Sequence, residues 1–392
     1  MMDNEQLPKG YKVTEVGIIP EDWEVYILGD LLLRIADVDH YMPKTEKYGI
    51  PYLMTGDIKD YASEIDFDNC KKISKDDFEK LSKKIRTLKS DIILARYATV
   101  GSVSYVDIDE EFVVSYSCVT IKPDKSKLND VFLFHYFKSN IFGLEVKNKV
   151  NANIQDNVGI GDLMKMKIPL PPTKSEQTAI ATALSDADAL INSLEKLIAK
   201  KRNIKQGAMQ QLLKPKEGWE VKKLGEVAEI YQPQTISQDV FIDDGYLVYG
   251  ANGIVGKYHL YNHETWQTTI TCRGSTCGTV NRTVGKSWIT GNAMVMNVDK
   301  NTNIDKLFFY YILTKQDFSQ CITGSGQPQI VRNPLFEFKV SIPKTNEEQT
   351  RIATILSDMD NEINALETKL EKYRKIKLGM MQVLLTGKVR LV

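Results

Sequence analysis

The chain has 392 residues, more than one ordinary hydrophobic core accommodates, so its length predicts at least two domains. Hydrophobic residues make up 42% of it, which excludes wholesale disorder, and 51 basic against 51 acidic residues give a net charge that does not by itself indicate a nucleic-acid partner. A polar N-terminus, no apolar run of membrane-spanning length and an odd number of cysteines predict a cytoplasmic protein with reduced thiols and no membrane contact.

The first part of the chain is predicted to form a mixed α/β module. Residues 1–20 form an N-terminal extension, and residues 21–172 contain short β-rich runs such as DIILARY and FVVSYSCVTI, separated by polar turns and a few helical patches. The module closes on the apolar run KIPLPP. We therefore expect a first globular module over residues 21–172.

A long helix is predicted next, over residues 173–214. Thr173 followed by Glu176 is a capping box, which opens a helix. Apolar residues then recur at alternating spacings of four and three, which is typical of a coiled-coil seam; those chosen as pairing residues are Ile180, Leu184, Ile191 and Leu194.

A second module over residues 215–344 is followed by a second copy of the helix over residues 345–392, tail included. EQTAIATALSD at Glu176 returns as EQTRIATILSD at Glu348, and the longer alignment holds 23 identities in 38 positions. Thr345 repeats the cap, and the matching seam residues are Ile352, Leu356, Ile363 and Leu366. Such long stripes cannot be buried on a small domain, so the predicted partner of each helix is the other copy. Gly207 and Gly379 are expected to mark a kink or a close packing contact.

The modules also resemble each other. DWEVYILG recurs as GWEVKKLG, and ILARYATVGSV recurs as ITCRGSTCGTV, an alignment that matches Arg96 with Arg273, Thr99 with Thr276 and Gly101 with Gly278. The chain is therefore a duplicated unit of module and helix, which can form a pseudo-dimer suited to a two-part target such as DNA with two half-sites.

No catalytic motif stands out in the sequence. NPLF at Asn333 has Leu335 where an adenine methyltransferase motif needs a second proline, and no glycine loop precedes it. GANGIVGKY departs from a phosphate loop. A zinc set could be drawn from His259, His263, Cys272 and Cys277, but the spacing fits no familiar finger, so no metal site is predicted.

These residues resemble a known family. The runs IPEDWEVYILGDL, IPLPPTKSEQTAIATALSDADALI and KQGAMQQLL, with the second helical copy, are similar to the specificity (S) subunit of type I restriction–modification enzymes. The resemblance covers essentially the whole chain. It implies a mixed α+β fold with two target-recognition domains, separated by two long antiparallel coiled-coil helices and related by a pseudo-two-fold axis. It also implies a non-catalytic subunit that reads a bipartite double-stranded DNA site. Its partners would be two methyltransferase (M) subunits, which would bind S-adenosylmethionine, and restriction (R) subunits; no cofactor is expected on this chain.

Base reading uses Arg or Lys for guanine and Asn or Gln for adenine, on loops that reach the major groove. In the first module the candidates are Arg96, Tyr97, Thr99, Lys147, Lys149, Asn151, Asn153 and Gln155. In the second they are Tyr249, Asn252, Lys257, Arg273, Thr276, Gln327, Gln329 and Arg332. Because Arg96 and Arg273 are shared by modules that would read different sequences, they fit a role in the fold or at a phosphate better than at a base.

Three other interpretations stay open at this point. One is a specificity subunit of a related system outside type I. Another is a coiled-coil scaffold that never meets DNA, which flat binding without salt dependence would favour. The third is an enzyme within the modules, such as a self-contained methyltransferase, which the missing motifs disfavour.

Overall fold

The computed structural model describes residues 7–149, 157–251, 253–324 and 328–391. By their internal contacts these residues form two compact units: unit 1 comprises residues 1–194 and 369–392, and unit 2 comprises residues 195–368. Over the described ranges, no helix combines the length and the apolar character needed to cross a membrane.

Unit 1 holds the first module. Its strands are β1 (Tyr11–Thr14), β2 (Gly17–Pro20), β3 (Glu24–Ile27), β4 (Leu32–Ala36), β5 (Ile50–Leu53), β6 (Lys71–Ile73), β7 (Ile92–Ala95), β8 (Val103–Tyr105), β9 (Val113–Val114), β10 (Cys118–Pro123) and β11 (Lys167–Leu170). Its shorter α-helices are α1 (Lys75–Ser82), α2 (Asp130–Phe137), α3 (Asn140–Lys149) and α4 (Ile160–Met164). The strands form a four-stranded sheet in the order β4-β10-β7-β8, a three-stranded sheet β6-β5-β9, and the pairs β1-β2 and β11-β3.

Unit 2 holds the second module. Its strands are β12 (Trp219–Lys223), β13 (Glu229–Tyr231), β14 (Tyr246–Gly250), β15 (Gly253–Tyr258), β16 (Thr268–Thr271), β17 (Val280–Arg282), β18 (Trp288–Ile289), β19 (Ala293–Asn297), β20 (Ile322–Thr323), β21 (Gln329–Ile330) and β22 (Lys339–Pro343). Its shorter α-helices are α6 (Leu224–Val227), α7 (Lys306–Thr314) and α8 (Arg332–Glu337).

The sheets of unit 2 repeat those of unit 1. The four-stranded sheet runs β13-β19-β16-β17, with all neighbours antiparallel as in unit 1. Each unit also has a three-stranded sheet with one parallel pair, β5-β9 in unit 1 and β14-β18 in unit 2. A strand near the start of each module pairs with the strand that precedes its long helix, β3 with β11 and β12 with β22. The duplication seen in the sequence is therefore a duplication of topology.

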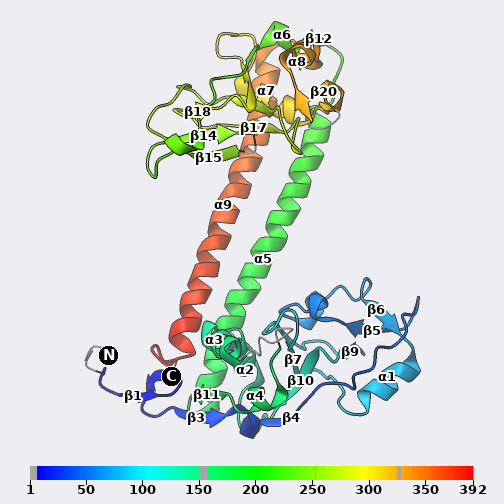
Figure 1. Cartoon of the computed structure of the whole chain (residues 1–392), viewed down its shortest axis with the longest axis vertical. Coiled ribbons are helices and arrows are strands. Elements are labelled where there is room, and N and C mark those ends of the chain that lie inside the picture. Colours follow the sequence, from blue (N-terminus) through cyan, green and yellow to red (C-terminus); the bar gives the residue numbers. More distant parts are fainter. Residues whose placement is uncertain (1–6, 150–156, 252, 325–327, 392) are drawn as a thin grey trace. The chain divides into compact units, whose positions relative to one another are not determined.

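The two longest helices are α5 (Lys174–Leu212) and α9 (Asn346–Leu384), of 39 residues each. They are the long green and orange-red helices in Figure 1. In unit 2, Lys201 forms an ion pair with Glu362, and Lys205 forms one with Asp360. Residue numbers thus rise along α5 while those of the partners on α9 fall. The helices are antiparallel, as the family resemblance implied.

The seam residues are buried in all but one case. Those with at most 9% of their surface exposed are Ile180, Leu184, Ile191, Leu194, Ile352, Leu356 and Ile363. Leu366 is half-buried. Both helical glycines, Gly207 and Gly379, have open space where a Cβ atom would lie, so neither marks a close packing contact.

The repeated sequence EQT contains a glutamine, Gln177 or Gln349, that hydrogen-bonds each long helix to its own module. Thr173 Oγ1 accepts a hydrogen bond from the Glu176 amide at 3.2 Å, which is the first half of the predicted capping box. Gln177 then accepts from the Asn129 amide through Oε1 at 2.8 Å and donates through Nε2 to the Pro171 carbonyl at 3.2 Å. The glutamine therefore fixes α5 both to the start of α2 and to the end of β11.

The second copy makes the same connections. The amide of Glu348 donates to Thr345 Oγ1 at 3.4 Å. Gln349 accepts from the Asp305 amide at 2.8 Å and donates to the Pro343 carbonyl at 3.1 Å. Identical letters in the two copies thus correspond to identical junctions between module and helix.

Candidate nucleic-acid interface

Each module has a loop that follows an interior strand of its four-stranded sheet, after β7 in unit 1 and after β16 in unit 2. The backbone of this loop meets a segment from late in the same module. The Val158 amide donates to the Arg96 carbonyl at 3.2 Å in unit 1, and the Ile330 amide donates to the Cys272 carbonyl at 3.0 Å in unit 2. Candidate residues that are far apart in the sequence therefore lie in adjoining segments.

The strand register corrects the sequence alignment of Arg96 with Arg273. The strand that pairs with β7 begins opposite Ala95, and the strand that pairs with β16 begins opposite Thr271. Ala95 and Thr271 are therefore equivalent, and Arg96 corresponds to Cys272. The alignment of the two arginines, made on letter identity, is wrong by one residue.

An extra residue in the second loop explains the error. Gly101 donates its amide to the Ala95 carbonyl, whereas Gly278 donates to the carbonyl of Thr271, so the turn takes six residues in unit 1 and seven in unit 2. Arg273 consequently occupies the place of Tyr97. Because a one-residue shift along an extended chain reverses the direction of a side chain, the two arginines face different surroundings.

Arg96 lies inside unit 1. Only 7% of its surface is exposed, and its Nη2 atom lies 2.7 Å from Oδ2 of Asp37, a carboxylate that is itself buried. Nη2 also lies 3.4 Å from the carbonyl oxygen of Tyr116. A guanidinium buried against a carboxylate in this way is not available to a base.

The second module places two candidate base readers side by side. Arg273 and Gln329 form an antiparallel β-bridge, and both residues are exposed. Thr276 is half-buried in the same loop. Arg332 is exposed at the start of α8, where its Nε atom donates to the Ile230 carbonyl at 2.7 Å. Arginine and glutamine are the residue types that read guanine and adenine, so this bridge is the strongest candidate in the described residues.

The first module places Tyr97 in the corresponding bridge, with Asn157. Tyr97 is half-buried, whereas Thr99 is exposed and its Oγ1 atom lies 3.4 Å from the Thr55 carbonyl oxygen. The position that carries arginine in the second module thus carries a tyrosine in the first. The frame is shared, but the side chain that it presents differs.

The lysine candidates of the first module lie on α3. Lys147 is exposed and Lys149 is half-buried at the end of this helix. Lys147 also lines a cavity of about 620 Å³, together with Lys59, Lys138 and Gly101 of the loop. Lys138 is paired with Asp60 there. The basic hollow beside Gly101 thus gathers three lysines, one of which is paired.

Two candidates of the second module lie on its three-stranded sheet. Tyr249 is only 7% exposed and packs with Ile289 and Val295 in a small core, so its ring is not available to a base. Lys257 is half-buried, and its Nζ atom lies 3.1 Å from the Asp243 carbonyl oxygen. Five further candidates lie outside the described residues: Asn151, Asn153, Gln155, Asn252 and Gln327.

Two of the four residues considered as a zinc set, His263 and Cys272, have other partners. His263 Nε2 lies 3.0 Å from the Tyr231 hydroxyl, and burial lowers the pKa of this histidine. Cys272 Sγ lies 3.2 Å from Nε2 of Gln232. Within residues 7–149, 157–251, 253–324 and 328–391, no group of three or more His, Cys, Asp or Glu residues is placed to hold a metal ion.

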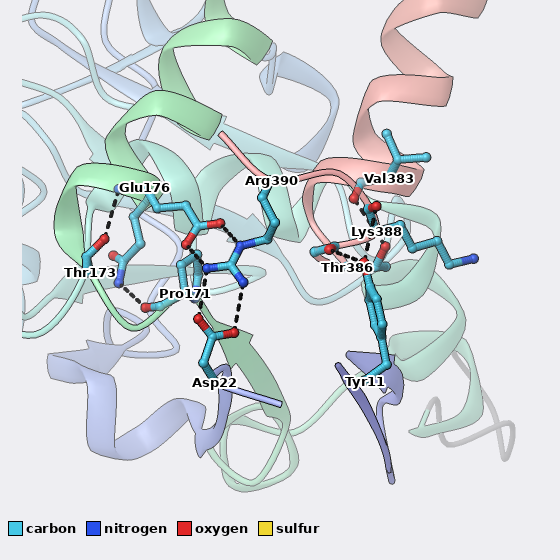
Figure 2. A network of polar contacts seen from close by, with 11 residues as sticks. Tyr11, Asp22, Pro171, Thr173, Glu176, Val383, Thr386, Lys388 and Arg390 are labelled. Carbon is cyan, nitrogen blue, oxygen red and sulfur yellow. Dashed lines mark hydrogen bonds and ion pairs between the residues drawn. The ribbon is translucent and has the colours of Figure 1, made fainter. Parts of the chain in front are cut away.

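Residues at the junctions of helix and module were not singled out from the sequence. Gln177 and Gln349 were visible as identical letters in the two copies, and that identity was the signal that could have found them. Arg390 gave no such signal, because it follows the region of repeat identity. Figure 2 shows its guanidinium between the carboxylates of Asp22 and Glu176.

Comparison with known proteins agrees with this architecture. The chain is 27% identical to the type I restriction enzyme MjaVIII specificity subunit of Methanocaldococcus jannaschii, over 95% of this chain and 94% of that one. It is 28% identical to the EcoprrI specificity subunit of Escherichia coli, over 71% and 73%. The fold matches the crystal structure of the type I S subunit from M. genitalium with a TM-score of 0.65 and 20% identity, over 92% of this chain and 96% of that one.

The family model described as the type I restriction modification DNA specificity domain matches the chain twice, over residues 20–206 and 216–375. Each match contains one of the modules whose sheets repeat and most of the long helix that follows it. The chain therefore belongs to the family of type I restriction–modification specificity subunits, the subunits that recognise DNA in those systems.

Proposed function

We propose that the two modules, residues 21–172 and 215–344, each read one half of a bipartite double-stranded DNA site. The observation that supports this most directly is the repeated loop: one backbone frame presents Tyr97 in the first module and Arg273 in the second. Two readers with one frame and different side chains suit two half-sites of different sequence.

The contacts with bases would come chiefly from exposed candidates. In the second module these are Arg273, Gln329 and Arg332, and in the first Thr99, with Tyr97 partly exposed. Lys147 and the basic hollow beside Gly101 would serve a phosphate, which fixes orientation without reading sequence.

The chain would act as a non-catalytic scaffold in the cytoplasm. Two M subunits would dock on it, because the duplicated helices offer two equivalent attachment faces, and R subunits would join for cleavage. S-adenosylmethionine would be bound by the M subunits, which would methylate adenine in each half-site.

The test is co-expression of the chain with its cognate M subunit, followed by methylation-resolved sequencing of the host genome. We expect methylated adenines in a motif of two specified halves and an unspecified gap, which disappears when this chain is omitted. The same motif without the chain, or no sequence-defined methylation with it, would refute the proposal. Native mass spectrometry should give two M subunits per chain; one M subunit at saturation would contradict the symmetric docking.

A further inference from the structure

The two long helices carry the same ion pair in both units. In unit 1, Asp188 of α5 pairs with Lys377 of α9. In unit 2 the roles are exchanged, because Lys205 of α5 pairs with Asp360 of α9. Both aspartates and both lysines are separated by the repeat distance of 172 residues, so the two contacts are equivalent.

Each aspartate also receives a hydroxyl group from its own module. Tyr61 donates to Oδ2 of Asp188 at 3.3 Å in unit 1. Tyr311, on α7, donates to Oδ2 of Asp360 at 2.7 Å in unit 2. One carboxylate thus joins three elements: the helix that carries it, the lysine of the other helix and the module.

The contact in unit 1 is largely removed from water. Asp188 is 7% exposed and Lys377 is 9% exposed. Burial lowers the pKa of Lys377, although its pairing with Asp188 acts in the opposite direction. His135 lies against the same carboxylate, and burial lowers the pKa of this histidine to about 3, so it adds no positive charge at neutral pH. In unit 2 the side chains of Lys205 and Asp360 are 21% and 34% exposed.

The apolar seam alone does not determine the direction of pairing, because both helices present nearly the same stripe. The charges do. If identical helices paired in parallel and in register, Lys205 and Lys377, which share an a position of the seam, would face each other. Asp188 and Asp360 share an e position and would lie on opposite flanks of the seam, each without its lysine. Antiparallel pairing brings opposite charges together at both places. A charge that is removed from water without a partner carries a desolvation cost, so the parallel arrangement is penalised.

We propose that the two Asp–Lys pairs are positioning residues that select the antiparallel pairing of α5 and α9 and, through Tyr61 and Tyr311, fix each module on its helix. This role does not depend on the DNA sequence that the chain reads. It can be tested on the purified full-length chain without DNA or partner subunits.

The experiment exchanges the charges while keeping composition and net charge constant. The mismatched variant carries Asp360→Lys and Lys377→Asp, which places like charges opposite each other in antiparallel helices. The matched variant adds Asp188→Lys and Lys205→Asp, which restores opposite charges at both places. All proteins also carry Lys201→Cys and Glu362→Cys, at positions whose native side chains form an ion pair 2.6 Å long across the helices.

The readouts are the yield of the disulfide-linked peptide after mild oxidation, measured by mass spectrometry, and the thermal unfolding midpoint. We expect the mismatched variant to lose at least about tenfold in linked yield and to unfold at lower temperature, since breaking buried pairs is strongly destabilising. The matched variant should recover most of the linked yield but only part of the unfolding midpoint, because Tyr61 and Tyr311 then face lysines and lose their carboxylate acceptors. An unchanged mismatched variant would overturn the proposal. So would a matched variant as impaired as the mismatched one, even if the latter does not fold, because local contacts rather than cross-helix pairing would then be responsible.

Discussion

Arg390 and Glu176 are 214 positions apart in sequence, yet Nη2 of the arginine lies 2.8 Å from Oε2 of the glutamate (Figure 2). The same guanidinium makes two further contacts with Asp22, of 2.8 and 2.9 Å. Glu176 is 2% exposed and lies in the first turn of α5, so the tail that follows α9 neutralises a buried carboxylate at the start of the other helix. In unit 2 the equivalent Glu348 accepts instead from Nε1 of Trp219 at 3.2 Å.

Arg390→Ala should therefore destabilise unit 1. Removing Arg390, which is itself partly exposed, leaves the buried Glu176 carboxylate without its cation, and we expect a loss of about 2–4 kcal/mol in the free energy of unfolding. Lys388→Ala, at an exposed side chain two residues earlier, should change it by less than about 0.5 kcal/mol. Urea denaturation of both variants measures the difference, and equal stabilities would show that the Arg390 contacts contribute nothing.

Gly387 and Gly379 offer a second comparison between a test position and a control position. Gly387 has a positive φ of 69°, and a Cβ atom there would lie 2.4 Å from Cγ of Pro20, so Gly387→Ala should destabilise the attachment of the tail by about 2 kcal/mol or more. Gly379 lies inside α9 with open space around it, so Gly379→Ala should stabilise by about 0.5–1 kcal/mol. Thermal midpoints that move in the same direction for both would contradict this description.

The two arginines that look alike in sequence should behave differently. Arg96→Ala removes the buried guanidinium from Asp37, which keeps its ion pair with Lys84 at 2.6 Å, and should destabilise unit 1 by about 1.5–3 kcal/mol. Arg273→Ala removes an exposed side chain, so it should leave the unfolding midpoint nearly unchanged. It should lower the rate of methylation, because recognition of the half-site read by the second module is weakened. Denaturation curves and methylation rates on single-site substrates test both statements. A stable Arg96→Ala protein with altered base preference would reverse the assignment.

Local features of the fold could be predicted from the sequence. The threonine caps at Thr173 and Thr345, and the buried stripes that follow them, depend on residues a few positions apart. The contacts of Arg96 and Arg390 could not be predicted, because their partners Asp37 and Glu176 are distant in sequence. Such partners become visible only once the chain is folded.

The candidate interface was less predictable than the fold. Sequence identity aligned Arg96 with Arg273. One extra loop residue in the second module is enough to make that alignment wrong. Hydrogen-bond register, which sequence identity does not report, decides which side of the sheet a residue faces. The prediction for Tyr249 failed for a different reason. The neighbouring glycines suggest a loop, whereas Tyr249 lies in β14 and its side chain packs inward.

His135 should make unit 1 sensitive to mild acid. Burial lowers its pKa from 6.5 to about 3 in the folded chain, with Lys377 and Lys138 lowering it further and Asp60 opposing them. The unfolded chain therefore binds more protons between pH 6.5 and 3, so stability should be fully present above pH 6.5 and decline below it. From pH 7 to pH 5 this one group should contribute a loss of up to about 2 kcal/mol.

The comparison with His135→Gln isolates that contribution from the carboxylates, which also titrate in acid. Glutamine retains a polar group that can reach the Ser185 hydroxyl, which lies 3.0 Å from the histidine Nε2 atom. The free energy of unfolding of the His135→Gln variant should fall less between pH 7 and pH 5 than that of the native chain. Parallel slopes in urea titrations at the two pH values would rule out a buried neutral histidine.

The central claim is that two independent modules read the two halves of one DNA site. Its most direct test replaces residues 21–172 with the corresponding module of a specificity subunit of different target, followed by methylation-resolved sequencing of cells that also express the M subunit. We predict a methylated motif in which one half is new, while the other half is the one read by the native chain. A motif in which both halves change together would contradict the account.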